Sequence, residues 1–202
     1  MDLTVDAPIV VRPGTNACFE HLVTAQAALT ACISGQNPGV DMVFHRNGRQ
    51  IRQTCFTGPY ELEVHGDAAL LPMQRHGWPS ELVMHVRKGS EHQERYPQLT
   101  GMQRLMGSIY EHAFVAYFER VRDRIEARFG RIALWPDTID FGRVVRNAFA
   151  HGGTVNISSG SREGSAWRGR SYTIADNGRQ VLYNDISSGD LTVLMLEIDE
   201  LL

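Results

Sequence analysis

Lysine is almost missing from this sequence, and neither sign of charge is in large excess. Of the 20 basic residues only Lys88 is a lysine, and the formal net charge is -3 at pH 7. A protein that coats nucleic acid through bulk attraction needs many positive charges, because such binding scales with the number of phosphates neutralised. The sequence therefore excludes that class, and any anion-binding site has to be local.

Cysteine, export signals and long apolar runs are also scarce. The three cysteines, at positions 18, 32 and 55, are widely spaced and form no C-x-x-C motif. This spacing argues against a disulfide framework and against a metal site with cysteine ligands. No cationic segment precedes an apolar run at the N-terminus. The longest apolar stretch, 17–33, contains polar residues and is too short to cross a bilayer. We expect a cytoplasmic protein without a membrane segment.

The composition that remains is that of a globular chain, with 43% hydrophobic and 21% charged residues, which is enough for one core. Apolar residues at helical spacing predict a first helix over 16–34, with Gly35 as its stop. From 40 to 89 the pattern favours short strands and turns, because Asn47-Gly48 is a hairpin signal and residues 60–64 alternate. We therefore predict an N-terminal lobe of unassigned type over 1–98.

The second half, 99–202, is predicted to be a mainly helical domain, which makes the whole chain α+β. An apolar stripe begins after a capping box formed by Thr100 and Gln103, and it predicts a helix of about 29 residues that ends at Gly130. A second capping box, Ser187 with Asp190, opens the last helix. Two long helices should therefore frame this half of the chain.

A shorter helix and a hairpin are expected between those two helices. Asp137 or Thr138 caps a helix that continues to His151, where Gly152-Gly153 ends it. Strand-like segments at 167–174 and 180–183 then flank Asp176-Asn177-Gly178, which reads as a β-hairpin turn. The predicted order of this half is helix, helix, hairpin, helix.

The shorter helix carries a polar stripe. At 100° per residue Arg143, Asn147 and His151 fall on one line with Arg146 beside it, while apolar residues cover the opposite side. Between 141 and 180 six arginines stand against two acidic residues: Arg143, Arg146, Arg162, Arg168, Arg170 and Arg179. We expect an anionic ligand near this helix, with Arg143, Arg168 and Arg170 as substrate-binding residues.

The segment RNAFAHGG, from Arg146 to Gly153, resembles the signature of the HEPN family (higher eukaryotes and prokaryotes nucleotide-binding), in which an Arg is followed after four to six residues by a His on one helix of a small bundle. Arg146, Asn147 and His151 match this motif, and the likeness covers about 99–202. The resemblance implies a HEPN-like helical bundle with a hairpin inserted before the last helix. Arg87 and His92 have the same spacing, but Gly89-Ser90 between them predict a loop, where the two side chains have no fixed relation.

The resemblance also implies a function, that of a metal-independent endoribonuclease without a cofactor. RNA cleavage needs a base, an acid and positive charge at the phosphate, so His151 would transfer protons, Arg146 would hold the phosphate and Asn147 would orient the imidazole or the substrate. One histidine does not easily act as acid and base at once, so the family's homodimer would complete the site. A toxin-like role would add an antitoxin partner, which the sequence does not identify.

Two further functions fit the same residues. The stripe would also suit a non-catalytic module that binds RNA or a nucleotide, or one that closes a dimer interface. The other possibility is that the helical domain is purely structural. The imidazolium of His151 would then interact favourably with the negative end of the helix dipole, Asn147 would satisfy a backbone group, and Arg146 would pair with Asp140 or with the last helix. The other histidines have no metal-ligand spacing. Trp167 and Tyr172 would suit base stacking, but aromatic residues in a hairpin more often form cross-strand packing.

Overall fold

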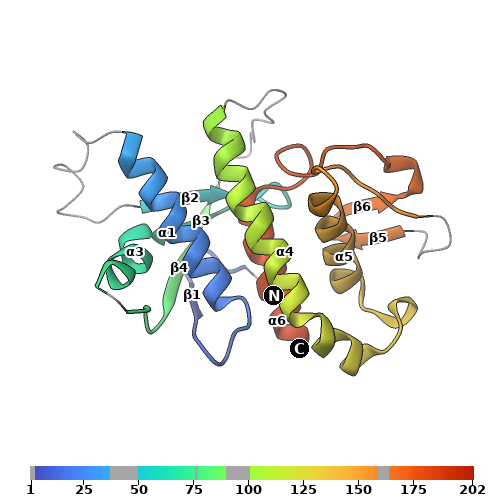
Figure 1. The fold of residues 1–202 in the computed structure, drawn as a ribbon, viewed down its shortest axis with the longest axis horizontal. Helices are drawn as coiled ribbons and strands as arrows, with labels where there is room; N and C mark the ends of the chain where they lie inside the picture. The colour runs from blue at the N-terminus through green and yellow to red at the C-terminus, as the bar shows by residue number, and fades with distance from the viewer. Residues whose placement is uncertain (1–2, 37–49, 76, 90–100, 159–163) are drawn as a thin grey trace.

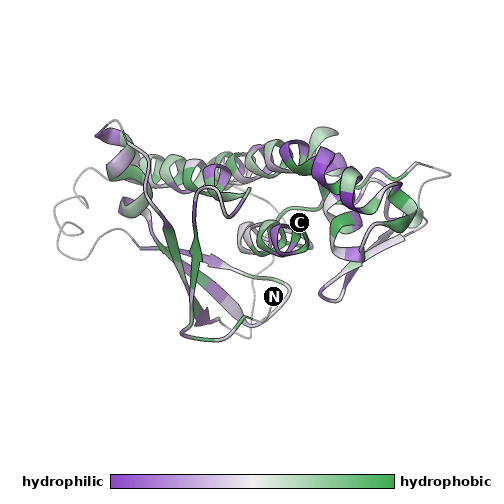
Figure 2. Cartoon of the chain, turned by 90° about the horizontal axis from the view of Figure 1, so that it is seen from below, coloured by the Kyte–Doolittle hydropathy of each residue, from purple (hydrophilic) through white to green (hydrophobic). Residues whose placement is uncertain are grey.

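The structure is a computed structural model that describes residues 3–36, 50–75, 77–89, 101–158 and 164–202. Two helices, α4 (Gly101–Phe129) and α6 (Ser188–Leu201), run through the middle of the molecule. A β-sheet with two helices lies on one side of them, and a shorter helix with a hairpin lies on the other (Figure 1). Seen from below, α6 lies under α4 between these two sides (Figure 2).

The N-terminal side is a four-stranded antiparallel sheet in the order β1-β4-β3-β2. Every second residue of β4 is buried, from Leu82 to Met84 to Val86, as the twofold repeat of a half-buried strand requires. The helix α1 (Phe19–Gln36) covers the buried face (Figure 1). The strands are β1 (Pro8–Val11), β2 (Gln50–Thr54), β3 (Tyr60–His65) and β4 (Leu82–Lys88).

The predicted first helix and the short strands of this side are confirmed, but the stop expected at Gly35 is wrong, because α1 continues through that glycine to Gln36. The structure adds a helix that the pattern did not predict, α3 (Gly66–Gln74), which contains Pro72 and begins with a glycine. Both residue types mark turns more often than helices, which explains the omission. The Asn47-Gly48 turn and the boundary expected at 98 lie outside the described residues.

The long and short helices of the second half are confirmed as α4 and α5 (Asp137–Ala150). The cap expected for α5 is wrong, because its N-cap is Pro136 and no side chain caps it; the Asp140 N–H donates to the Pro136 carbonyl at 2.9 Å. The glycine stop is confirmed, since Gly152 and Gly153 have φ of 84° and 85°, a region open to glycine. The Thr100 capping box lies outside the described residues.

The hairpin lies earlier than predicted. Its strands are β5 (Gly164–Trp167) and β6 (Arg170–Thr173), and its turn is Arg168-Gly169, with φ of 45° and 75°. Two successive positive φ angles are what a two-residue hairpin turn requires. The predicted turn residue Asn177 instead accepts from the Ile157 N–H at 2.7 Å and donates to the Ile157 carbonyl at 3.0 Å. The Asn177-Gly178 pair therefore lies in a loop whose asparagine binds the backbone of Ile157, and it does not form the hairpin turn.

The capping box of α6 is confirmed: Ser187 Oγ accepts from the Asp190 N–H at 3.1 Å, and Asp190 Oδ2 accepts from the Ser187 N–H at 2.8 Å. Buried hydrophobic residues from both sides of the molecule belong to one core. The described residues thus form a mixed helix and sheet fold, in agreement with the α+β class. None of the helices in these described ranges is long and apolar enough to cross a membrane.

Candidate functional site

The helix α5 buries its apolar residues on both the hairpin and α4. On the hairpin side Phe141 stacks on Tyr172, with ring centroids 5.2 Å apart, and lies 5.5 Å from Trp167. On the α4 side Gly142 allows close approach, because an added Cβ would come within 3.0 Å of the Phe118 ring. The polar stripe, which begins at Arg143, is therefore held against α4.

The stripe and α4 together form a small hollow, the α4–α5 cleft, with a volume of about 170 Å³. Three of its residues are apolar, and the other five are three arginines, one amide and one carboxylate. Two of its residues come from the connection that contains the short helix η1 (Ile132–Leu134). The lining residues are Phe118, Glu119, Arg122, Ile132, Trp135, Arg143, Arg146 and Asn147.

Each arginine of the cleft has an acidic partner. Arg143 Nε donates to Asp140 Oδ1 at 2.8 Å, and Arg122 Nε donates to Glu126 at 2.9 Å. Arg146 Nη2 forms an ion pair with Glu119, and Arg146 Nη1 donates to Asn147 Oδ1 at 2.9 Å. The pairing predicted for Arg146, with Asp140 or the last helix, is wrong, because Arg143 occupies Asp140 and α4 presents Glu119.

These partners do not use all the donors of the two α5 arginines. Within the part of the chain that the structure describes, Arg143 Nη2 and Arg146 Nε are buried and have no hydrogen-bond acceptor. Native proteins leave few buried N–H groups in this state, because each one costs about 1–3 kcal/mol. An anion in the cleft would supply the missing acceptors.

His151 lies outside the cleft. It is the C-cap residue that follows α5, it is exposed, and its N–H donates to the Ala148 carbonyl at 3.0 Å. A helix rises 1.5 Å per residue, so His151 is about 7.5 Å further along the axis than Arg146. The structure brings Arg143, Arg146 and Asn147 into one hollow. It leaves His151 exposed at the C-terminal end of α5.

The two arginines of the hairpin have structural contacts instead. Arg168 Nη2 pairs with Glu197 at 2.6 Å, and Arg170 Nη2 donates to the Phe56 carbonyl at 3.0 Å. Burial acts to raise the pKa of Glu197, but hydrogen bonds from Arg168 and Trp167 hold it below its ordinary value. Neither arginine lines the cleft, so the structure does not bring them together with the stripe. Arg162 lies outside the described residues.

Base stacking by the hairpin aromatics is excluded by their burial. Trp167 is 4% exposed and Tyr172 is 1% exposed, and both rings face Phe141. Of the two alternatives, packing is therefore the correct one. The sequence had not indicated Trp135 as part of the cleft; its Nε1 donates to the Gly130 carbonyl at 2.9 Å, which fixes the connection between α4 and α5.

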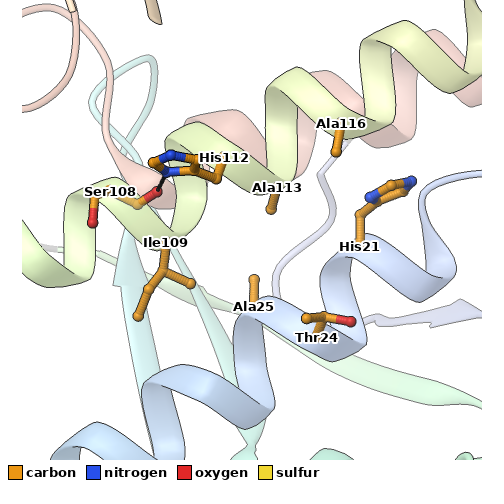
Figure 3. A pocket seen from close by; sticks show the side chains of 8 residues that line it. All are labelled: His21, Thr24, Ala25, Ser108, Ile109, His112, Ala113 and Ala116. Atoms are coloured by element: carbon orange, nitrogen blue, oxygen red, sulfur yellow. Dashed lines mark hydrogen bonds between the residues drawn. The ribbon is translucent and has the colours of Figure 1, made fainter. Parts of the chain in front are cut away.

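A larger hollow of about 420 Å³ lies between α1 and α4. Small side chains such as Ala25, Ala113 and Ala116 line it, with His21 and His112 near opposite ends (Figure 3). Burial, aided by Arg120, lowers the pKa of His21, which favours its neutral form at pH 7. No Asp, Glu, Lys or Arg side chain is among the described residues that line this groove, and the stripe remains the stronger candidate.

Among the residues that the structure describes, no group of three or more His, Cys, Asp or Glu side chains is placed to hold a metal ion. Comparisons with protein-family models, curated proteins and solved structures find no match to this chain. The HEPN resemblance therefore stays a prediction from the motif.

Proposed function

We propose that the α4–α5 cleft and the adjoining end of α5 bind phosphate groups of RNA or of a nucleotide. The observation that carries this proposal is the pair of buried, unused donors, Arg143 Nη2 and Arg146 Nε, beside a hollow of about 170 Å³. Guanidinium groups present several N–H donors in a plane, which matches the oxygens of a phosphate. The site is local, as the net charge of the chain requires.

The three arginines and the amide of the cleft have distinct parts in this binding. Arg143 and Arg146 donate to the phosphate oxygens from the α5 side of the cleft, where their side chains are 12% and 27% exposed. Arg122, at 50% exposed, lies on the open rim and adds attraction that salt screens more strongly. Asn147 accepts from Arg146 and so holds that guanidinium in place.

The second candidate function is a metal-independent endoribonuclease of the HEPN type. The exposed position of His151, the C-cap residue of α5 four residues after Asn147, favours it, because an RNA held at Arg146 would continue towards the imidazole. A single subunit offers one histidine there, so cleavage requires a homodimer that brings two copies of the stripe together. A toxin-like role and an antitoxin partner belong to this candidate only.

The binding proposal is tested with a fluorescent single-stranded RNA and three proteins. Arg146→Ala should weaken binding about tenfold, because a charge-assisted contact to phosphate is lost. The matched control is Arg104→Ala, which removes one exposed charge of α4 outside the cleft and should change affinity less than twofold. Equal affinity of all three proteins would refute the proposal.

Incubation of the same RNA in EDTA separates the two candidates. The nuclease should cut RNA but not DNA and leave 2',3'-cyclic phosphate ends, because the 2'-hydroxyl is the nucleophile, and His151→Ala should abolish cleavage. If the protein binds RNA through Arg146 and cuts nothing as a dimer, the binding module is the function. Cleavage that His151→Ala does not reduce would belong to another site or to a contaminant.

A further inference from the structure

Glu119 already occupies part of the α4–α5 cleft as an internal anion. Its carboxylate lines the hollow and pairs with Arg146, the residue whose Nε is left without an acceptor in the described structure. Its side chain is 41% exposed and attached to α4, so a rotation about its own bonds would release the guanidinium without moving the helix. A phosphate that binds Arg146 fully has to replace this carboxylate.

That competition discriminates between two kinds of phosphate. A phosphodiester in the RNA backbone carries one negative charge, as the carboxylate does, so the exchange gains no charge. Glu119 also has the advantage of being tethered, which gives it an effective concentration that a free ligand has to exceed. A terminal phosphomonoester carries about -1.5 to -2 at pH 7. Only the monoester brings more charge to Arg146 than it displaces.

The volume of the cleft also favours a terminal phosphate group as its ligand. Its volume of about 170 Å³ is below the roughly 300–1,000 Å³ of pockets that enclose a whole small molecule. Phe118 and Trp135 close the inner side, and both side chains are nearly fully buried. The hollow therefore has room for one terminal group, while the rest of a chain stays outside, along α5.

We propose that the α4–α5 cleft selects a terminal phosphomonoester of RNA or of a nucleotide, and that Glu119 is the residue that determines this specificity. The inference depends on the proposed function, since it assumes that Arg146 binds phosphate. It goes beyond it by naming the chemical class of the ligand and the residue that rejects the backbone diester. A 5'-phosphate and a 3'-phosphate share this chemistry, and the experiment distinguishes them.

The test measures the affinity of one internally labelled RNA oligonucleotide in three forms: with a 5'-phosphate, with a 3'-phosphate, and with hydroxyl groups at both ends. The variants are Glu119→Gln and a matched control, Glu126→Gln. Both remove one negative charge from the exposed side of α4, at 41% and 48% exposure, but Glu126 pairs with Arg122 on the rim. Each variant frees one arginine of the cleft: Glu126→Gln frees Arg122 on the exposed rim, and Glu119→Gln frees Arg146, which has the buried donor without an acceptor in the described structure. The long-range attraction changes equally in both, so the comparison isolates the competition at Arg146.

We expect the wild type to bind one of the phosphorylated forms about five- to tenfold more tightly than the hydroxyl form, because of the extra charge beside Arg146. In Glu119→Gln the ratio should fall below about twofold, mainly because the hydroxyl form gains affinity. Glu126→Gln should keep the wild-type ratio. Lowering the pH from 7.5 to 5.5 should reduce the wild-type preference, since the monoester takes up a proton near pH 6.

The failures of the two proposals are distinguishable. If Arg146→Ala weakens binding but the three RNA forms bind the wild type equally, or if Glu119→Gln and Glu126→Gln behave alike, the specificity inference is wrong and phosphate binding stands. If Arg146→Ala has no effect on any form, phosphate binding in the cleft is wrong and the inference falls with it. A preference that appears in the wild type and disappears only in Glu119→Gln supports both.

Discussion

Two groups of arginines in the second half of the chain differ in the buried donors that their ion pairs and hydrogen bonds leave unused. In the α6 polar cluster, which comprises Arg168, Arg170, Asp190 and Glu197, both arginines bond to groups of the chain itself. In the α4–α5 cleft, two guanidinium nitrogens are buried without an acceptor among the described residues. An arginine without a buried, unused donor among the described residues serves the fold alone, whereas one that keeps such a donor is available to a ligand. Sequence position alone does not separate the two.

The largest effect is expected in the α6 polar cluster, at Asp190. Its carboxylate accepts from the N–H groups of Phe56 and Thr57 at 2.7 and 3.1 Å and from Ser187 at 2.8 Å. Asp190→Ala leaves these groups without their acceptor, and each buried donor costs about 1–3 kcal/mol. We expect the free energy of unfolding in urea to fall by about 3–5 kcal/mol. Asp190→Asn keeps one acceptor oxygen and should lose roughly half as much.

This cluster also shows what the sequence could predict. The capping box of Ser187 and Asp190 depends on residues three apart, so the pattern contains it. The contact of Asp190 with Phe56 and Thr57 joins segments more than 130 positions apart, and no local pattern encodes it. Asn-Gly is a strong turn signal and predicts the hairpin turn at Asn177. The fold instead forms the turn at Arg168, which has a positive φ and pairs with Glu197.

The cleft was predictable to a similar extent. Helical periodicity predicted that Arg143, Arg146 and Asn147 share a face, and the structure confirms that they line one hollow. It did not predict that α4 would turn Glu119 towards Arg146, because the rotation of one helix against another depends on packing, here at Gly142. The same periodicity placed His151 in the stripe, although the helix ends there and its side chain lies outside the cleft.

An intermediate effect is expected at Glu197, and it should depend on pH. The folded state holds the pKa of Glu197 below its ordinary value, which is about 4.3 in an unfolded chain. A lowered folded pKa contributes stability that is present above pH 4.3 and is lost as the pH falls through the folded value. Glu197→Gln should therefore cost about 1 kcal/mol at pH 7. The difference between wild type and variant, measured by urea unfolding, should shrink below pH 4; a constant difference down to pH 2.5 would contradict it.

The smallest effect on stability is expected at Arg146. Comparing it with the effect at Arg168 tests whether the cleft arginines serve a ligand or the fold. Arg146 and Glu119 are 27% and 41% exposed, and ion pairs at such positions contribute about 0–1 kcal/mol. Arg146→Ala also removes a buried N–H that lacks an acceptor in the described structure, which offsets part of that loss. We expect its free energy of unfolding to stay within about 0.5 kcal/mol of the wild type, while Arg168→Ala, at 21% exposed beside Glu197, costs about 2 kcal/mol. If thermal and urea unfolding show that Arg146→Ala destabilises the protein as much as Arg168→Ala, the two groups are both structural. The cleft would then have no claim to a ligand, and the helical half of the chain would be a scaffold.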